Sequence, residues 1–352
     1  MRIFNLRRSN VSSIIYVIYI ILLIVLLFSC LKSLKLTSNR IHAKQIENPK
    51  LVVVSFSDVI NLQVCTSLLS ALLMEWEYVL LTKSNITMPI DAKMLKPFNY
   101  QKYLNDDADV NSYILFADAF DILFQQSSDS ILSFIENNFL LSSKVFFSAE
   151  KECYPATHPH PEIYFCPLTQ GQEYLDNRSG TIPLLCRMEI DKARQESSSY
   201  DSIFLNSGIS IGAWKNQKSI LEKFFSLMET LPQKCFEDQG IYSWLYVTGN
   251  DILLDFRSQH FLSAYLKLES YKFDSSQGLW KDSEGFSPSL IHFNGDKSQL
   301  LPMMKTFFDW HQSRSGKINF EEKMKNFQFK LDGKSHNYSQ ICSKYVNDFL
   351  NN

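Results

Sequence analysis

The sequence has little net charge, no internal repeat and no low-complexity segment. Its 35 lysines and arginines almost balance 37 aspartates and glutamates, which leaves a formal net charge of -2 at pH 7. A chain without a basic field does not gather nucleic acid, so we expect no nucleic-acid partner. The lack of low-complexity segments and the 45% hydrophobic content exclude a disordered chain. At 352 residues the chain can bury the core of one large α/β domain or of two small ones.

Charged residues are absent from the run between Val11 and Leu31. A run of that length spans a bilayer as a helix, and a cleaved signal peptide is the alternative. We predict a type II membrane protein that contacts the membrane through this helix. The predicted organisation is a cytoplasmic tail (1–10), a transmembrane signal anchor (11–31), a stem (32–50), a main domain (51–305) and a C-terminal extension packing on that domain (306–352).

Apart from Cys30 inside this run, the cysteines are Cys65, Cys153, Cys166, Cys186, Cys235 and Cys342. They allow three disulfides, with buried reduced thiols as the alternative. Glycosylation sequons at Asn85, Asn177 and Asn337 also agree with a lumenal domain. We therefore predict a secretory-pathway membrane protein of the Golgi or endoplasmic reticulum, with its main domain in the lumen.

Short apolar runs alternate with helical patterns along the main domain. Strands are predicted at 51–56, 77–81, 113–117, 145–148 and 204–211, and helices at 93–104, 217–227 and 239–247, among others. The strands read as continuous apolar runs, whereas an exposed antiparallel sheet would alternate apolar and polar residues. This pattern favours an α/β fold with a mostly parallel, Rossmann-like central sheet and helices flanking both faces.

One of these strands ends at a carboxylate and meets a second one three residues later. Asp118 follows the apolar run 113–117, and a turn beginning there brings Asp121 to the same side. In open α/β sheets the carboxyl ends of the strands are where ligands bind. Two hard oxygen ligands suit Mg²⁺ or Mn²⁺. A helix cap at Asp118 with a solvated Asp121 is the alternative interpretation.

A second candidate element surrounds His292 near the end of the main domain. An imidazole as third ligand would shift the preference from Mg²⁺ toward Mn²⁺. Gly295 would let backbone N–H groups approach a phosphate, and Lys297 would add a cation beside it. The alternative is a hydrogen-bonded histidine at a strand end, followed by a surface turn.

These motifs resemble the glycosyltransferase domain of procollagen lysyl hydroxylases, which has a GT-A fold. The resemblance extends over residues 51–301 in the order of that family, through the sequence blocks FADAFDIL (116–123), VFFSAE (145–150), FLNSGISIG (204–212), EDQ (237–239) and HFNG (292–295). It implies a UDP-sugar donor and a protein or glycan acceptor. Two features depart from the family pattern: the acidic run before Gln239 is short, and Phe293 stands in place of a glycine. They leave the identity of the sugar and of the acceptor open.

The resemblance also implies roles for individual residues. Asp118, Asp121 and His292 would hold Mn²⁺ or Mg²⁺, and the main chain from Ala117 to Phe120 would hold the uridine and ribose. The remaining implied residues are Phe98 for uracil stacking, Gly295 and Lys297 beside the phosphates, and Asp238, Asn206 and Asn294 as catalytic residues. Asp238 would orient the acceptor hydroxyl or accept its proton, while Glu237 and Asp238 as helix caps are the alternative.

The sequence therefore predicts a metal-dependent glycosyltransferase that moves a hexose, galactose or glucose, from a UDP-sugar to a hydroxyl group. A non-catalytic GT-A relative that binds a glycan or a protein partner is the alternative.

Overall fold

The computed structural model describes residues 50–82, 92–138, 143–154, 174–176, 180–182, 184–197, 202–230, 237–264, 268–295 and 297–351. The chain divides into two units, Met1–Glu47 and Asn48–Asn352. The first unit lies outside the described residues. The second contains every described helix and strand.

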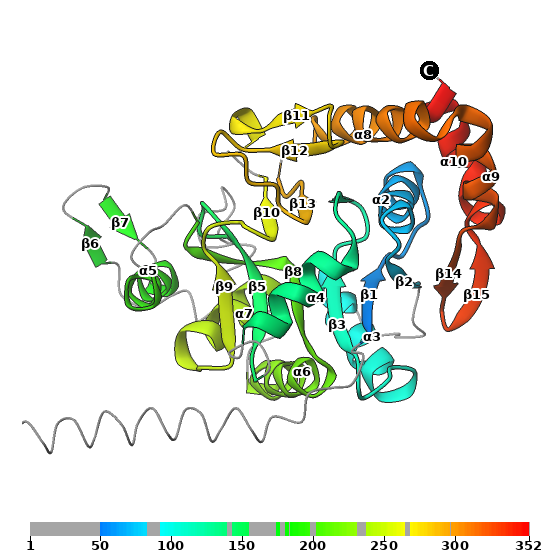
Figure 1. The fold of residues 1–352 in the computed structure, drawn as a ribbon. Coiled ribbons are helices and arrows are strands. Elements are labelled where there is room, and N and C mark those ends of the chain that lie inside the picture. The colour runs from blue at the N-terminus through cyan, green and yellow to red at the C-terminus, as the bar shows by residue number, and fades with distance from the viewer. Residues whose placement is uncertain are drawn as a thin grey trace, which may run out of the picture. The chain divides into compact units, whose positions relative to one another are not determined.

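An 11-stranded sheet forms the centre of the second unit (Figure 1). Its strands follow the spatial order β15-β14-β2-β1-β3-β8-β5-β10-β13-β4, and β9 pairs with β5. Their bounds are β1 Leu51–Phe56, β2 Glu77–Leu81, β3 Tyr113–Ala117, β4 Ile122–Phe124, β5 Val145–Glu150, β8 Phe204–Ala213, β9 Ile252–Asp255, β10 Phe261–Ser263, β13 Leu290–His292, β14 Gln328–Leu331 and β15 Lys334–Asn337. Two separate pairs are β6 (Tyr174–Asp176) with β7 (Gly180–Ile182), and β11 (Lys272–Asp274) with β12 (Leu279–Lys281).

Most strand pairings in the central sheet are parallel, as the continuous apolar runs predicted. β1 lies parallel to both β2 and β3, and β5 lies parallel to β9 and β10. Every residue of β1, β3 and β5 is buried, which is the pattern of strands covered on both faces. β8 runs antiparallel between β3 and β5, and the β4–β13 and β14–β15 pairs are antiparallel as well.

Helices cover both faces of this sheet. Their bounds are α2 Leu62–Leu73, α3 Ala92–Asp106, α4 Ser128–Asn137, α5 Leu184–Glu196, α6 Trp214–Thr230, α7 Asp238–Thr248, α8 Leu300–Ser315, α9 Lys317–Asn326 and α10 Tyr338–Asn351. On one face, Val52 and Val54 of β1 share an apolar cluster with Tyr100 of α3, Phe224 of α6 and Tyr246 of α7. The predicted helices at 93–104, 217–227 and 239–247 correspond to α3, α6 and α7 and are confirmed.

The orientation of β8 brings several strand ends to one edge of the sheet. Because β8 is antiparallel to both β3 and β5, those two strands run in the same direction, together with β10 and β13. Their carboxyl ends therefore lie beside the amino-terminal half of β8. A bulge in the β5–β8 pairing, next to Ser148 and Asn206, locally re-aims the side chains there.

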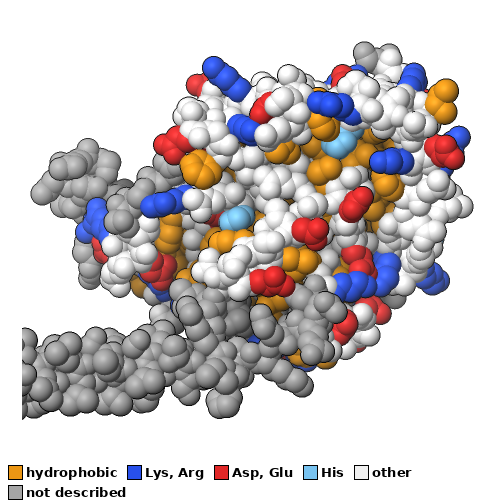
Figure 2. Space-filling view, viewed as in Figure 1, with side chains coloured by type: hydrophobic (Ala, Val, Ile, Leu, Met, Phe, Trp, Pro, Cys, Tyr) orange, Lys and Arg blue, Asp and Glu red, His pale blue; other side chains and the backbone are white. Residues whose placement is uncertain are grey.

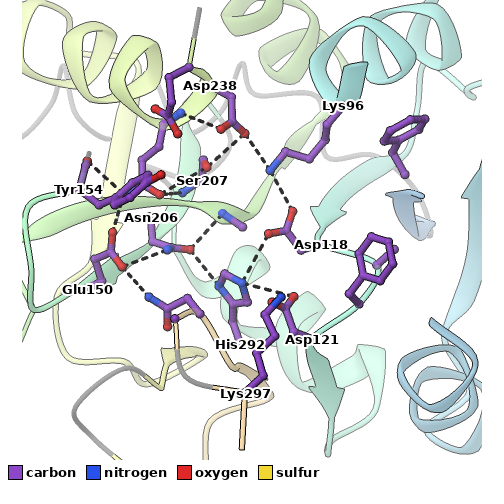
Figure 3. Close-up of a pocket in the computed structure, with 18 of the residues that line it drawn as sticks. Lys96, Asp118, Asp121, Glu150, Tyr154, Asn206, Ser207, Asp238, His292 and Lys297 are labelled. Carbon is purple, nitrogen blue, oxygen red and sulfur yellow. Dashed lines mark hydrogen bonds and ion pairs between the residues drawn. The ribbon is translucent and has the colours of Figure 1, made fainter. Parts of the chain in front are cut away.

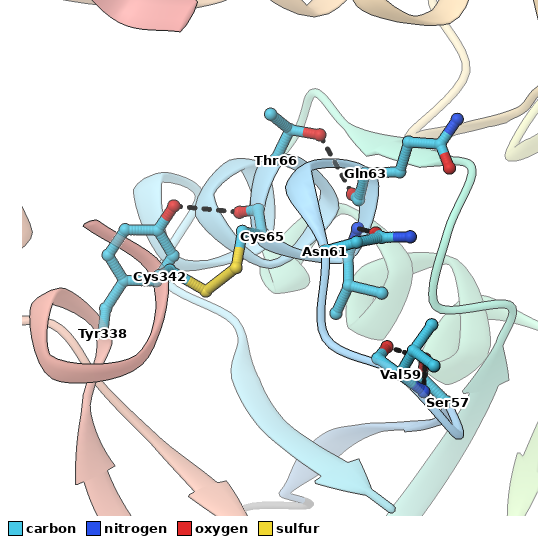
Figure 4. Close-up of a disulfide and its surroundings, with 9 residues drawn as sticks. Ser57, Val59, Asn61, Gln63, Cys65, Thr66, Tyr338 and Cys342 are labelled. Carbon is cyan, nitrogen blue, oxygen red and sulfur yellow. Dashed lines mark hydrogen bonds between the residues drawn. A yellow bond between two sulfur atoms is a disulfide. The ribbon is translucent and has the colours of Figure 1, made fainter. Parts of the chain in front are cut away.

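The C-terminal residues complete the other side of the sheet. β14 pairs in parallel with β2, and β15 folds back on β14. A disulfide joins Cys342 of α10 to Cys65 of α2, and the Tyr338 hydroxyl donates to the Cys65 carbonyl at 3.0 Å (Figure 4). A second disulfide joins Cys153 to Cys186, so two of the cross-links that the cysteine pattern permits are present.

The fold prediction is corrected on one point, because the N-terminal transmembrane helix is not seen in the described part of the chain. The segment 11–31 lies outside the described residues, and no helix in the described part of the chain combines the length and the apolar character needed to cross a membrane. The longest of those helices, α6, has 17 residues and carries lysines and glutamates, whereas a spanning helix needs about 20 mainly apolar residues. The membrane contact predicted through residues 11–31 is likewise not supported by the described residues.

Charged side chains of both signs are interspersed over the face seen in Figure 2. Lysines and arginines lie among aspartates and glutamates, and neither sign forms a large region on the part of that face that the structure describes. This distribution matches the near balance of charges in the sequence.

Removing the disulfide between α2 and α10 should destabilise the domain. The bond closes a loop between cysteines 277 positions apart, so it restricts the unfolded chain strongly. We expect the Cys65→Ala/Cys342→Ala variant to lose about 2–4 kcal/mol of unfolding free energy, measured by urea denaturation. An unfolding curve that matches the wild-type curve, with the wild-type cysteines oxidised, would contradict this prediction.

Candidate metal and donor site

Three side chains from distant parts of the sequence converge at the strand-end edge. Asp118 follows β3, Asp121 precedes β4, and His292 is the last residue of β13. The His292 Nε2 atom lies 3.5 Å from Asp118 Oδ2 and 3.5 Å from Asp121 Oδ1 (Figure 3). One ligand atom from each side chain lies within 4.8 Å of the other two. The turn between the two aspartates, expected from the sequence, is what brings both carboxylates to one side.

The chemistry of these three side chains fits a divalent cation. Asp121 Oδ1 is buried and has no hydrogen-bond partner, which costs free energy unless a positive group compensates it. His292 Nδ1 lies 3.0 Å from Asn206 Oδ1. Since an amide oxygen only accepts, Nδ1 donates, and the lone pair of Nε2 is available in the neutral ring. Two carboxylates and one imidazole nitrogen therefore point to a common centre.

Asn206 fixes the orientation of the imidazole. Its Oδ1 also accepts from the Ser148 hydroxyl at 3.1 Å and from the Gly208 backbone N–H at 3.0 Å. Its Nδ2 donates to Glu150 Oε2 at 3.2 Å. These bonds determine which amide atom faces His292, and so they also select the tautomer of the ring.

Gly208 provides the space that the imidazole occupies. A Cβ atom at this position would lie 2.1 Å from His292 Cε1 and 2.6 Å from its Nδ1. No side chain fits that gap, so glycine is required here by a close approach. The sequence block 204–212 contained this glycine, but its role depends on a partner far away in the chain.

Glu150 ends β5 and links the polar residues on one side of the cavity. It accepts from Gln239 Nε2 and Asn294 Nδ2, both at 2.5 Å, in addition to Asn206. Burial raises the pKa of Glu150 to about 7, against the opposing effect of these amide hydrogen bonds. The sequence prediction gave it no role, although an apolar strand ending at a carboxylate is the same signal that identified Asp118.

Lys96 joins the metal side of the cavity to Asp238. Its Nζ lies 2.8 Å from Asp118 Oδ1 and 2.8 Å from Asp238 Oδ2, and the lysine side chain is 14% exposed. The sequence prediction missed this residue. The available signal was the spacing of Lys96 and Tyr100, which are four residues apart and therefore share the buried side of α3.

Glu237 and Asp238 have separate roles at the start of α7. The Glu237 side chain accepts from the Gly240 N–H at 2.7 Å and caps the helix. Asp238 is 3% exposed, and its Oδ2 faces Lys96 and accepts from the Ser207 hydroxyl at 3.2 Å. The capping alternative thus describes Glu237, and both side chains line the cavity.

The charges of the site perturb each other strongly. Burial acts to raise the pKa of Asp118, but Lys96 and His292 outweigh it and hold the pKa below its usual range. Burial acts to lower the pKa of His292, yet Asp121 and Asp118 raise it to about 9. The excess of carboxylate charge around the imidazole is therefore large enough to hold an added positive charge, whether a proton or a metal ion.

A cavity of about 650 Å³ opens over these groups. Beyond the metal group, the predicted residues that line it are Phe120, Asn206, Asp238, Asn294, Gly295 and Lys297. Ala117 is not among the lining residues, and its carbonyl accepts from the Tyr100 hydroxyl at 3.2 Å. Phe98 does not line the cavity, because its ring packs against Phe225 with centroids 4.6 Å apart. The aromatic residues at the cavity wall are instead Phe56, Phe120 and Tyr154.

A family model described as the PLOD GT domain matches residues 95–182, the segment that contains Asp118, Asp121 and Glu150. This match confirms the resemblance to the glycosyltransferase domain of procollagen lysyl hydroxylases. The mixed α/β architecture with a largely parallel central sheet is consistent with the GT-A fold of such domains. Together these findings support glycosyl transfer as the general class of reaction.

Several solved glycosyltransferase structures show distant similarity. One, involved in the glycosylation of the major capsid of PBCV-1, aligns with 75% of this chain and 100% of its own, at 11% identity and a TM-score of 0.40. Two structures of GlyE from Streptococcus pneumoniae TIGR4, one of them the apo form, align with 78% of this chain and 63% of theirs, at 11% and 13% identity and TM-scores of 0.40. No curated protein matches. These structures are too dissimilar to indicate a function, so the reaction class rests on the family match.

Adding a methyl group at Gly208 should weaken metal binding. In Gly208→Ala the new Cβ would occupy the place of the imidazole, so we expect Mn²⁺ affinity to fall about 10–100-fold by calorimetry. The matched control is Gly212→Ala on the same strand, where the added Cβ would approach a Val145 methyl group at 3.1 Å, away from the site. Equal Mn²⁺ affinities for the two variants would contradict the prediction.

Removing the Lys96 ammonium should strengthen metal binding. The lysine occupies one oxygen of Asp118 and repels a cation held by the same carboxylate. We expect Lys96→Met to bind Mn²⁺ about tenfold more tightly than wild type, while the uncompensated Asp118 and Asp238 lower its melting temperature. Unchanged or weaker Mn²⁺ binding in a folded variant would show that Lys96 does not compete with the ion.

Proposed function

We propose that this chain is a metal-dependent glycosyltransferase that moves a hexose, galactose or glucose, from a UDP-sugar to a hydroxyl of a protein or glycan acceptor. The observation that carries the proposal is the meeting of Asp118, Asp121 and His292 at the base of the cavity. The family match supplies the reaction class.

Asp118, Asp121 and His292 would hold the cation, with Mn²⁺ favoured over Mg²⁺ because one ligand is an imidazole. When bound, the ion supplies positive charge beside the diphosphate leaving group. Asn206 and Gly208 keep the imidazole in place and leave its Nε2 facing the aspartates.

Residues after β13 would receive the donor phosphates. Gly295 has a φ of 79°, a conformation that favours glycine and turns the main chain sharply beside the cavity. Lys297 Nζ lies 2.8 Å from Asp121 Oδ2, and its side chain is 42% exposed. A flexible, half-exposed lysine at this place can move from the carboxylate to a phosphate oxygen. Phe120 and the main chain beside Ala117 would contact the nucleoside.

The opposite wall would receive the acceptor. Asp238 is held in position by contacts with Lys96 and Ser207. In that state it can orient the acceptor hydroxyl or accept its proton. Asn206 and Asn294 would border the transferred sugar, and both amides are fixed by Glu150.

We also propose that the domain works in the lumen of the secretory pathway. The disulfides Cys65–Cys342 and Cys153–Cys186 support this, because such bonds persist in oxidising compartments. The sequon at Asn337 lies at the end of β15, while Asn85 and Asn177 lie outside the described residues.

The test is a transfer assay with UDP-galactose and UDP-glucose, Mn²⁺ and hydroxyl-bearing peptide and glycan acceptors, read as released UDP. We expect Mn²⁺-dependent turnover with at least one donor. Asp238→Asn keeps the size of the side chain but loses its charge, and it should lower kcat about 100-fold. Binding of UDP with Mn²⁺ should change only a few-fold in this variant, since Asp238 faces the acceptor side.

The matched control is Asp129→Asn, an exposed carboxylate in the first turn of α4, which should retain wild-type turnover. Calorimetry that detects neither Mn²⁺ nor UDP binding would sink the transferase proposal. Binding without transfer to any acceptor would favour the non-catalytic relative, and full activity of Asp238→Asn would remove only the role given to that residue.

A further inference from the structure

A second cavity, of about 590 Å³, lies at the far end of the strands that carry the metal group. β4 and β13 pair antiparallel, so Asp121 and His292 lie at one end of the pair. Gln125 and Ser287, which line the second cavity, flank the other end. Asp121 and Gln125 flank the three residues of β4 and are four positions apart, a distance of about 13 Å. The remaining walls come from the β11–β12 hairpin and from α8, which lie next to each other in Figure 1.

The lining of the second cavity is mainly apolar, and its described residues carry no unpaired charge. It includes no aspartate or glutamate among the described residues. Its lysine, Lys281, is paired with Asp274 at 2.7 Å. Burial, with help from Lys323, lowers the pKa of His311 to about 4, so this ring is uncharged at neutral pH. The cavity therefore offers no carboxylate for a metal ion and no unpaired lysine or charged histidine for a phosphate group.

Aromatic rings and hydrogen-bonding groups share this lining. The Phe286 side chain is 53% exposed, one of few large apolar side chains in the described chain with such exposure. Trp310 forms a second aromatic wall, and the Arg314 guanidinium lies 5.3 Å from its ring centroid. Gln277 and Ser127 supply an amide and a hydroxyl group. Gln126 and Ser287 also line the cavity, with Gln126 Nε2 donating to the Ser287 carbonyl at 2.7 Å. A sugar ring has apolar C–H faces and a rim of hydroxyl groups, which matches this combination of aromatic and neutral polar groups.

The walls are held rigidly. Trp310 Nε1 donates to the Ser275 carbonyl at 2.7 Å, and a Cβ on Gly278 would lie 2.5 Å from the indole ring. Gln125 Nε2 donates to the Pro288 carbonyl at 2.6 Å, and its Oε1 accepts from the Trp280 N–H at 2.8 Å. A cavity with walls fixed in advance loses little entropy when a ligand binds.

We propose that this second cavity binds a neutral saccharide, independently of the metal site. Phe286 and Trp310 contact the apolar face of the sugar, and the glutamine and serine groups bind its hydroxyls. The inference does not depend on the transferase activity, because binding to the second cavity is measured without turnover.

The test uses saturation-transfer NMR on the intact protein with lactose, maltose and cellobiose, each at millimolar concentration and without UDP or Mn²⁺. We expect at least one disaccharide to receive saturation from the wild-type protein. Phe286→Ala, which removes a half-exposed ring, should lower that signal at least fivefold while leaving the melting temperature unchanged. Trp310→Phe, which keeps a ring but loses the indole N–H, should lower it as well.

Two variants serve as controls. Ile318→Ala removes an apolar side chain that is 80% exposed and does not line this cavity, so it should keep the signal. Asp238→Asn alters the metal-site cavity and should also keep it. Loss of the signal in Asp238→Asn with retention in Phe286→Ala would overturn the proposal, because the sugars would then bind at the metal site. Absence of a signal with all three disaccharides would overturn it too.

Discussion

The hydrogen bond between Asn206 and His292 is the interaction on which the rest of the site depends. It joins the antiparallel strand β8 to the end of β13, fixes the ring tautomer, and directs Nε2 toward two carboxylates. The same asparagine reaches Glu150, which in turn holds Gln239 and Asn294. The metal group and the acceptor wall therefore share one network, and a change at Asn206 would disturb both.

Much of the fold could be predicted from local pattern. The apolar runs at 51–56, 77–81 and 113–117 are the buried parallel strands β1, β2 and β3, because a strand covered on both faces needs apolar residues at every position. The reversed direction of β8 could not be predicted, since its sequence is equally apolar in either orientation. The pairing of the polar strand β14 with β2 gave no signal either, because only one of its four residues is buried.

Site residues that directly follow a strand could be predicted from the sequence. Site residues whose position depends on contacts between distant elements could not. Asp118 and Asp121 follow an apolar strand, so both stood out in the sequence. The location of Lys96 between Asp118 and Asp238 depends on how α3 packs beside α7. Phe98, two residues away on the same helix, points instead to Phe225 of α6. Neighbouring positions on a helix face different directions, which a resemblance between families does not resolve.

The parallel pairing of β14 with β2 has a consequence for the nascent chain. β2 is synthesised early, and its free edge carries the apolar residues Tyr78 to Leu81. The strand that covers this edge, β14, is synthesised about 250 residues later than β2. Until then, β2 offers unpaired backbone groups to any neighbouring polypeptide, which is the situation that promotes aggregation. The fold therefore protects that edge only after β14 has been synthesised.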